Sequence, residues 1–169
     1  MGDWGPNICP QKSPFGPLTK GDIMRRIRNK IYMKKWMENG DRYEGELNND
    51  LREGQGTLFY SDGDRYEGEW KNDKRHGFGK LFLANGSYYE GEWIEDYING
   101  FGKFVYSSGV TYEGDFQDAI YHGVGILTKP GHWIHNGEFK DGLPDGQGIR
   151  FYPDGKEIDG EWYEGVIDI

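Results

Sequence analysis

The chain has 169 residues, the size of one ordinary domain, but only 35% are hydrophobic while 16% are aromatic and 28 are glycine, so it lacks the aliphatic content of a conventional two-layer core. Its net charge is −9, divided between +5 on residues 1–40 and −14 on the remainder, and an acidic body argues against a nucleic-acid surface. The single cysteine, Cys9, excludes an internal disulfide and a cysteine-based zinc site, and the lack of a long apolar run or a charged-then-apolar leader predicts an intracellular protein.

The first thirty residues are predicted to hold two segments. Residues 1–19 contain four prolines and should form an extended arm without structure of its own. Residues 20–30 are predicted to form a short basic helix with Ile23 and Ile27 on one face. The alternative is a helix that continues through Met37.

Residues 31–37 are predicted to form a degenerate opening strand, in which two lysines discourage pairing at the edge of a sheet. The basic side chains up to this point either neutralise the acidic body or bind an anionic partner. The N-terminal basic arm comprises Arg25, Arg26, Arg28, Lys30, Lys34 and Lys35.

From there on, one five-residue motif, typically Tyr-Glu-Gly-Glu-Trp, recurs every 23 residues. The copies are Tyr43–Leu47, Tyr66–Trp70, Tyr89–Trp93, Tyr112–Phe116 and, more weakly, His135–Phe139 and Ile158–Trp162. A Gly-x-Gly motif and a third glycine series keep the same period. Together they place 21 of the 28 glycines in phase with the repeat.

The pattern Tyr-x-Gly-x-Trp, then six residues, then Gly-x-Gly resembles the MORN (membrane occupation and recognition nexus) repeat family over about residues 37–162. Copies that begin at Tyr66 and Tyr89 match in full, and those at Tyr43 and Tyr112 differ only at the Trp position. The resemblance implies tandem β-hairpins. Members of this family occur in radial-spoke heads and other parts of cilia, in junctional proteins that tether membranes, and as accessory parts of lipid kinases and a lysine methyltransferase.

Alternation with a period of two predicts that both motifs are strands. The turn Ser61–Gly63 has a glycine where a three-residue hairpin loop needs a left-handed residue. The six residues 71–76 are predicted to form the next loop, which would pair Trp70 with Gly77. The expected fold is all-β, a single-layer antiparallel meander of about twelve strands.

This array should cover residues 31–169, with an incomplete last hairpin at 156–169. On one face, large rings would lie over the glycine rows and line a groove that binds a partner. The predicted groove residues are Tyr43, Tyr66, Trp70, Tyr89, Trp93, Tyr112, Phe116, Phe139 and Trp162.

The second face is predicted to carry two rows of side chains. One is a charge ladder in which Lys80 lies between Glu67 and Glu90, and Lys103 between Glu90 and Glu113. The other is an apolar row, a second candidate for an interface because exposed apolar rows usually mark one. Its members are Phe78, Phe101 and Val124.

No catalytic constellation emerges from the motifs. The glutamate pairs repeat on an open face rather than converging in a pocket, and the Gly-x-Gly motifs begin strands rather than helices. The histidines lack the company of a closed metal site, and Cys9 lacks a base nearby in sequence. We therefore expect no enzyme, no cofactor and no metal.

The predicted function is a non-catalytic scaffold or adaptor that binds protein subunits of a larger assembly through the aromatic groove and the N-terminal arm; homodimerisation stays open. By resemblance, a short chain made almost entirely of repeats is most similar to the cytoskeletal and ciliary members, which favours the axoneme and a radial-spoke-type assembly. One alternative is a peripheral module that binds or tethers anionic lipid, which the acidic body disfavours. The other is an accessory subunit of a large enzyme complex.

Overall fold

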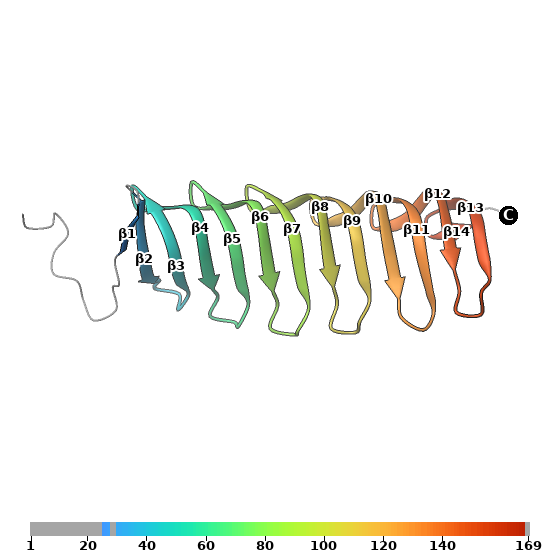
Figure 1. Cartoon of the computed structure of the whole chain (residues 1–169), viewed down its shortest axis with the longest axis horizontal. Helices are drawn as coiled ribbons and strands as arrows, with labels where there is room; N and C mark the ends of the chain where they lie inside the picture. Colours follow the sequence, from blue (N-terminus) through green and yellow to red (C-terminus); the bar gives the residue numbers. More distant parts are fainter. Residues whose placement is uncertain (1–24, 28–29, 168–169) are drawn as a thin grey trace, which may run out of the picture.

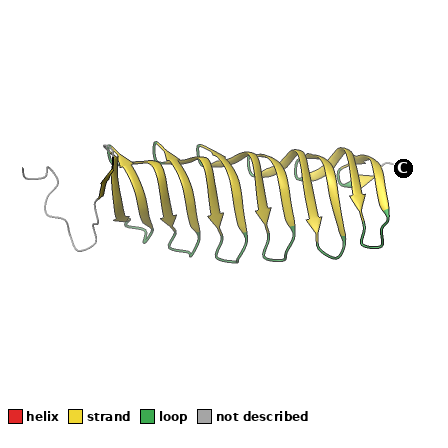
Figure 2. Ribbon diagram, viewed as in Figure 1, coloured by secondary structure: helices red, strands yellow, loops and turns green. Residues whose placement is uncertain are grey.

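The computed structural model describes residues 25–27 and 30–167, with side chains described from residue 32 onward. All of its regular elements are strands (Figure 2). In chain order they are β1 (Arg25–Ile27), β2 (Lys30–Trp36), β3 (Arg42–Asn48), β4 (Leu51–Phe59), β5 (Arg65–Lys71), β6 (Lys74–Phe82), β7 (Tyr88–Ile94), β8 (Tyr97–Val105), β9 (Thr111–Gln117), β10 (Ile120–Lys129), β11 (Trp133–Lys140), β12 (Leu143–Phe151), β13 (Glu157–Tyr163) and β14 (Val166–Ile167).

Each strand pairs only with its neighbours in the sequence, so the fourteen strands form one open sheet in the order β1 to β14 (Figure 1). Every pairing is antiparallel. This confirms the predicted all-β meander in a single layer. The predicted strand number of about twelve is too low, because β1 and β14 add a short strand at either end.

The helix predicted over residues 20–30 is wrong where the structure describes it. Arg25–Ile27 is strand β1 and pairs with Lys30–Tyr32 of β2. A helix this short is marginal by itself, whereas a strand gains ladder hydrogen bonds along an otherwise open edge. Residues 1–24 and 28–29, which include the predicted proline-rich arm, lie outside the described residues.

The structure confirms the predicted three-residue turns, which we call the wide turns, but not the predicted six-residue loops, which are replaced by tight two-residue turns. In the turn Ser61–Gly63 the glycine has φ +99°. The predicted six-residue loop over 71–76 is wrong: the chain reverses in two residues, Asn72 and Asp73, with φ of 50° and 67°, and Trp70 pairs with Arg75 rather than with Gly77. Two consecutive positive φ angles mark a type I′ turn, whose twist matches that of the flanking strands.

Because the tight turn takes only two residues of the predicted loop, the remaining ones join the flanking strands and one strand forms a bulge. The register shifts between the pair Gly68–Gly79 and the pair Trp70–Arg75, and Gly77 inside the bulge has φ +61°. The Glu69 carboxylate covers this bulge and accepts a hydrogen bond from the Phe78 N–H at 3.1 Å. The second glutamate of the motif therefore has a structural role, and the bulge bends the hairpin as bulges do.

The aromatic face is built on the glycine rows. The Tyr66 ring lies over Gly68 and Gly79, so closely that a Cβ on Gly79 would overlap the ring and its hydroxyl. That hydroxyl donates to the Glu69 carbonyl oxygen at 3.0 Å, and burial raises its pKa above the usual value. Glycine's lack of a side chain therefore gives this single layer its core.

The rings of this face contact one another in one continuous series. Trp70 packs edge-on against Tyr43 and Tyr66, with ring centroids 5.5 and 5.2 Å apart, and its Nε1–H donates to the Gly56 carbonyl. In order of contact the series is Tyr43, Trp70, Tyr66, Trp93, Tyr89, Phe116, Tyr112, Phe139, His135 and Trp162. Edge-to-face geometry suits the ring quadrupoles, so each repeat is stabilised by the next.

Arginine–aspartate pairs cover the rings at the tight-turn side. The Arg75 guanidinium lies 4.3 Å from the centre of the Trp93 ring, and its Nε donates to Asp96 Oδ1 at 3.0 Å. Arg52 makes the same contacts with Trp70 and Asp73 one repeat earlier. These pairs join each hairpin to the next and shield the tryptophans from water.

Candidate functional site

The nine predicted groove residues are the core of the protein. Their side chains are at most 4% exposed, because each ring is covered by its neighbours in the series and by the glycine backbone. A partner could contact these rings only if they separated from one another. Their role as a partner-binding groove stays a prediction, whereas their packing role is visible in the contacts.

The predicted row on the second face is exposed. Phe78, Phe101 and Val124 have relative exposures of 62%, 52% and 61%. We call these three residues the apolar row. The register pairs them in turn with Glu92, Asp115 and Glu138 on the following strand. Apolar and acidic side chains therefore alternate across the sheet.

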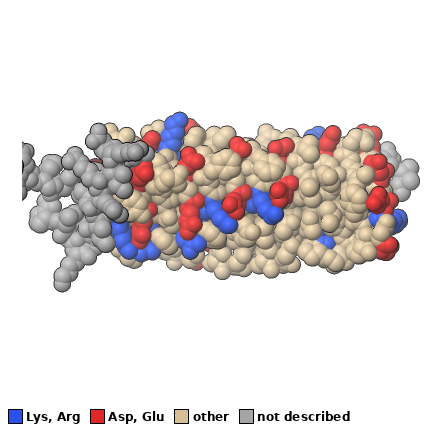
Figure 3. All heavy atoms as spheres, in the orientation of Figure 1, with Lys and Arg blue, Asp and Glu red and all other residues tan. Residues whose placement is uncertain are grey.

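The charge ladder lies beside the apolar row. Lys80 pairs in register with Glu67 and Glu90, and Lys103 pairs with Glu90 and Glu113, as predicted. The lysine nitrogens lie 3.0 Å from Glu90 and 2.8 Å from Glu113, and the hydrogen bond to Glu113 raises the pKa of Lys103. Figure 3 shows this alternation of blue and red side chains along the middle of the face. Such exposed pairs set register more than they add stability.

The ladder ends after Glu113, where sequence reasoning missed a change. Ile126 and Ile149 occupy the positions of Lys80 and Lys103 in the next two repeats, with Asn136 between them. In Figure 3 the middle of the face is tan there, and charged side chains lie only nearer its borders. The signal was present in the sequence, because these isoleucines are in phase with the two lysines.

A second exposed apolar set was also missed. This set flanks the tight turns on the same face. In the middle repeats it includes Ile94 and Tyr97, which pair in register and are 52% and 63% exposed. Ile120 and Leu143 belong to the same set in the following repeats. These residues fall inside or next to the segments that were predicted as loops. A face that combines such apolar rows without a covering layer is typical of an interaction surface.

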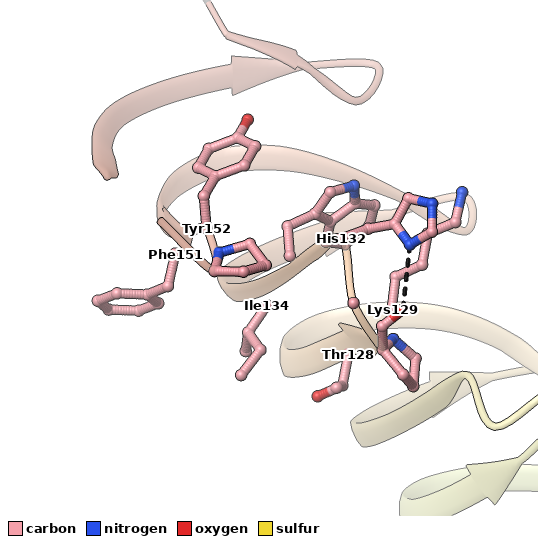
Figure 4. A pocket seen from close by; sticks show the side chains of 10 residues that line it. Thr128, Lys129, His132, Ile134, Phe151 and Tyr152 are labelled. Atoms are coloured by element: carbon pink, nitrogen blue, oxygen red, sulfur yellow. Dashed lines mark hydrogen bonds between the residues drawn. The ribbon is translucent and has the colours of Figure 1, made fainter. Parts of the chain in front are cut away.

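One depression, of about 210 Å³, lies at the wide turns of the fifth repeat (Figure 4). Its lining residues are Thr128, Lys129, Pro130, Gly131, His132, Trp133, Ile134, Phe151, Tyr152 and Pro153. His132 Nδ1 lies 3.0 Å from the Pro130 carbonyl oxygen and so serves the turn. The lining offers no pair of differently tuned acid–base groups of the kind that catalysis needs.

His135 takes the place of the core tyrosine in this repeat. Its side chain is fully buried, and neither ring nitrogen has a hydrogen-bond partner among the described residues. The Arg150 guanidinium lies nearby, between the rings of Trp133 and Trp162 at 4.3 and 4.0 Å. Desolvation first, and then the positive charge of Arg150, lower the pKa of His135 to about 4.

The buried imidazole predicts a pH-dependent weak point. Because the folded pKa of His135 is about 4 against an ordinary 6.5, the unfolded chain binds a proton below pH 6.5 that the folded chain does not. The free energy of unfolding should therefore fall by about 3 kcal/mol between pH 6.5 and pH 4 through this residue. Urea titrations at several pH values measure this loss of unfolding free energy, and His135→Phe should remove the contribution of this residue. An unchanged pH profile in His135→Phe would refute the assignment.

Some residues of the N-terminal basic arm take part in the fold, and others lie at the surface. Lys34 pairs with Glu44 at 2.9 Å, and Lys35 is exposed. Arg25 and Arg26 lie in β1, and Lys30 begins β2. Arg28 lies outside the described residues.

The described part of the chain shows no group of three or more histidine, cysteine, aspartate or glutamate side chains that could hold a metal ion. Nor does it contain a helix with the length and apolar character to cross a bilayer.

Comparison with known proteins assigns the family. The MORN repeat model matches residues 43–65, 66–88, 89–111, 112–133 and 135–157. Among solved structures, the TCP domain of SAS-4 (dCPAP) of Drosophila melanogaster, in complex with a proline-rich motif of Ana2 (dSTIL), is similar with a TM-score of 0.49 and 17% identity over 94% of this chain and 88% of that chain. No curated protein matches this chain. The five matched repeats show that the chain belongs to the MORN-repeat family.

Proposed function

We propose that this chain is a non-catalytic scaffold that binds protein partners along its second face. The exposure of the apolar row on a continuous sheet is the observation that supports this, because these side chains have no covering layer within the described residues. The edge-to-face ring series on the other face holds the sheet in one defined shape. A partner then meets a surface that is already ordered, which lowers the entropic cost of binding.

We further propose a place for this scaffold in a cytoskeletal assembly of the cilium or flagellum, where the N-terminal basic arm contacts an additional subunit. This finer assignment is supported only by the family and by the make-up of the chain, in which most described residues belong to repeats. Its competitors are an accessory role in an enzyme complex and a lipid-binding role of the arm. The use of Lys34 in the fold weakens the lipid role.

The test combines fractionation with a surface variant. Tagged protein in its native cells should stay with the detergent-resistant cytoskeleton and crosslink to fixed neighbours, which mass spectrometry identifies. The double variant Phe78→Ser, Phe101→Ser should reduce these crosslinks at least tenfold and leave stability nearly unchanged, since both side chains are exposed.

Tyr163→Ser is the matched control, because Tyr163 is even more exposed, at 69%, but lies at the end of the array. It should leave the crosslinks intact. Release of the protein alone from membranes by detergent would instead support lipid binding. Equal loss of crosslinks in the control would remove the apolar row from the interface.

A further inference from the structure

The apolar row has a regular spacing that restricts what can bind to it. Phe78, Phe101 and Val124 occupy the same register position on β6, β8 and β10, which are every second strand of the sheet. With about 4.8 Å between strands, successive members of the row are about 9.6 Å apart, and the first and last are about 19 Å apart.

The acidic side chains beside the apolar row carry charge that no described residue neutralises. Glu69, Glu92 and Asp115 each accept a hydrogen bond from a bulge N–H, at 3.1, 3.4 and 3.1 Å. Within the part of the chain that the structure describes, none of the three forms an ion pair, whereas Glu90 and Glu113 of the neighbouring ladder do. Among these described residues, the apolar row is therefore flanked by negative charge that has no cationic partner.

The surface beside Phe78 is also hollowed. A shallow hollow of about 350 Å³ lies over the Gly68–Gly79 pair, between the apolar row and the ladder. Its charged lining consists of Glu67, Glu69, Lys80 and Glu90, and Gln55 and Phe78 complete it. With three carboxylates and one ammonium group, it favours a cationic side chain packed against the Phe78 ring.

A polyproline II segment fits this spacing better than other conformations. It has three residues per turn and a rise of about 3.1 Å, so residues i, i+3 and i+6 recur about every 9.3 Å on one side. In an α-helix, residues i and i+7 lie on the same face about 10.5 Å apart. The mismatch between this step and the spacing of the apolar row grows to about 2 Å from Phe78 to Val124. In a β-strand, residues i and i+3 point to opposite sides.

We propose that the second face binds a proline-rich, basic segment of a partner protein in the polyproline II conformation, running across β6, β8 and β10. Every third residue of the segment packs on Phe78, Phe101 and Val124, and arginine or lysine residues between them face Glu92 and Asp115. This inference rests on the proposed function and names its partner class. The prolines of this chain's own first nineteen residues are four, four and three residues apart and so do not match the step of three.

The test uses a fluorescein-labelled peptide with three Pro-Ala-Arg repeats and fluorescence anisotropy on the full chain at about 0.15 M salt, where non-specific charge attraction is screened. A peptide of the same composition with unevenly spaced prolines should bind at least tenfold more weakly, although its charge is equal. Replacing the arginines by glutamate should abolish binding.

Two protein variants localise the site. Phe101→Ser should weaken binding at least tenfold, and Glu92→Gln, whose amide oxygen can still accept the bulge N–H, should weaken it about fivefold. Tyr163→Ser should have no effect. Equal affinity for the even and uneven peptides, or tighter binding of an amphipathic helical peptide of the same charge, would overturn the proposal.

The two levels of proposal can fail separately. If no proline-rich peptide binds while Phe78→Ser, Phe101→Ser still removes the native crosslinks, the scaffold function stands and the partner class is wrong. If neither the peptides nor the native neighbours depend on these residues, both proposals fall.

Discussion

Replacement of Gly79 by alanine should lower the free energy of unfolding by about 3 kcal/mol or more, although it adds a single methyl group. A Cβ at this position would overlap the Tyr66 ring and hydroxyl. The ring is fully buried and cannot shift without leaving Trp70 and Trp93, which it contacts edge-on at 5.2 Å each. The cost therefore includes overpacking and lost burial of a large aromatic side chain. Urea unfolding followed by tryptophan fluorescence measures it.

Two comparisons separate this close contact from glycine's conformational freedom. Gly131→Ala has open space around its Cβ but φ +73°, so it should cost only about 1 kcal/mol. In a Tyr66→Ala background, Gly79→Ala should become nearly neutral, because the clashing ring is gone. An equal cost in both backgrounds would show that the Tyr66 ring is not the reason for this glycine.

Trp93→Ala should have the largest effect of a core truncation, about 4 kcal/mol. The indole is 2% exposed, joins Tyr66 to Tyr89, and supports the Arg75 guanidinium. Because each repeat contacts only its neighbours, the loss of one central contact should also divide the array into two units that unfold separately.

Trp162→Ala is the matched control at the end of the array. The Trp162 side chain is only 3% exposed, but in the ring series it contacts only His135. This variant should fray the last hairpin and leave the main unfolding transition in place. Hydrogen exchange by mass spectrometry distinguishes the two outcomes by the repeats that lose protection. Equal and uniform loss in both variants would contradict the nearest-neighbour picture.

The candidate site shows where sequence reasoning succeeded. The register of Lys80 between Glu67 and Glu90 follows from the period of 23 and from alternation in strands, and the structure confirms it. The exposure of Phe78 on the second face follows from the same alternation.

Other features depend on local geometry that the motif does not encode. The tight turn at Asn72 and Asp73 requires two residues with positive φ, which asparagine and aspartate tolerate better than other non-glycine residues without being restricted to it, and its consequence is the bulge at Gly77. The role of Glu69 at that bulge becomes visible only once the turn is known.

The fold class, the repeat boundaries and the order of the strands follow from the sequence, because each 23-residue repeat holds two strands joined by short turns, which pairs each strand with its neighbours along the chain. The sequence also placed the large rings on one face and the charge ladder on the other. Which of these faces is covered depends on packing in three dimensions: the rings fill the space above the glycines and bury one another, so the predicted groove residues form the core. The apolar row stays exposed because the sheet has a single layer and the bulge carboxylates beside the row bond to the backbone rather than covering it.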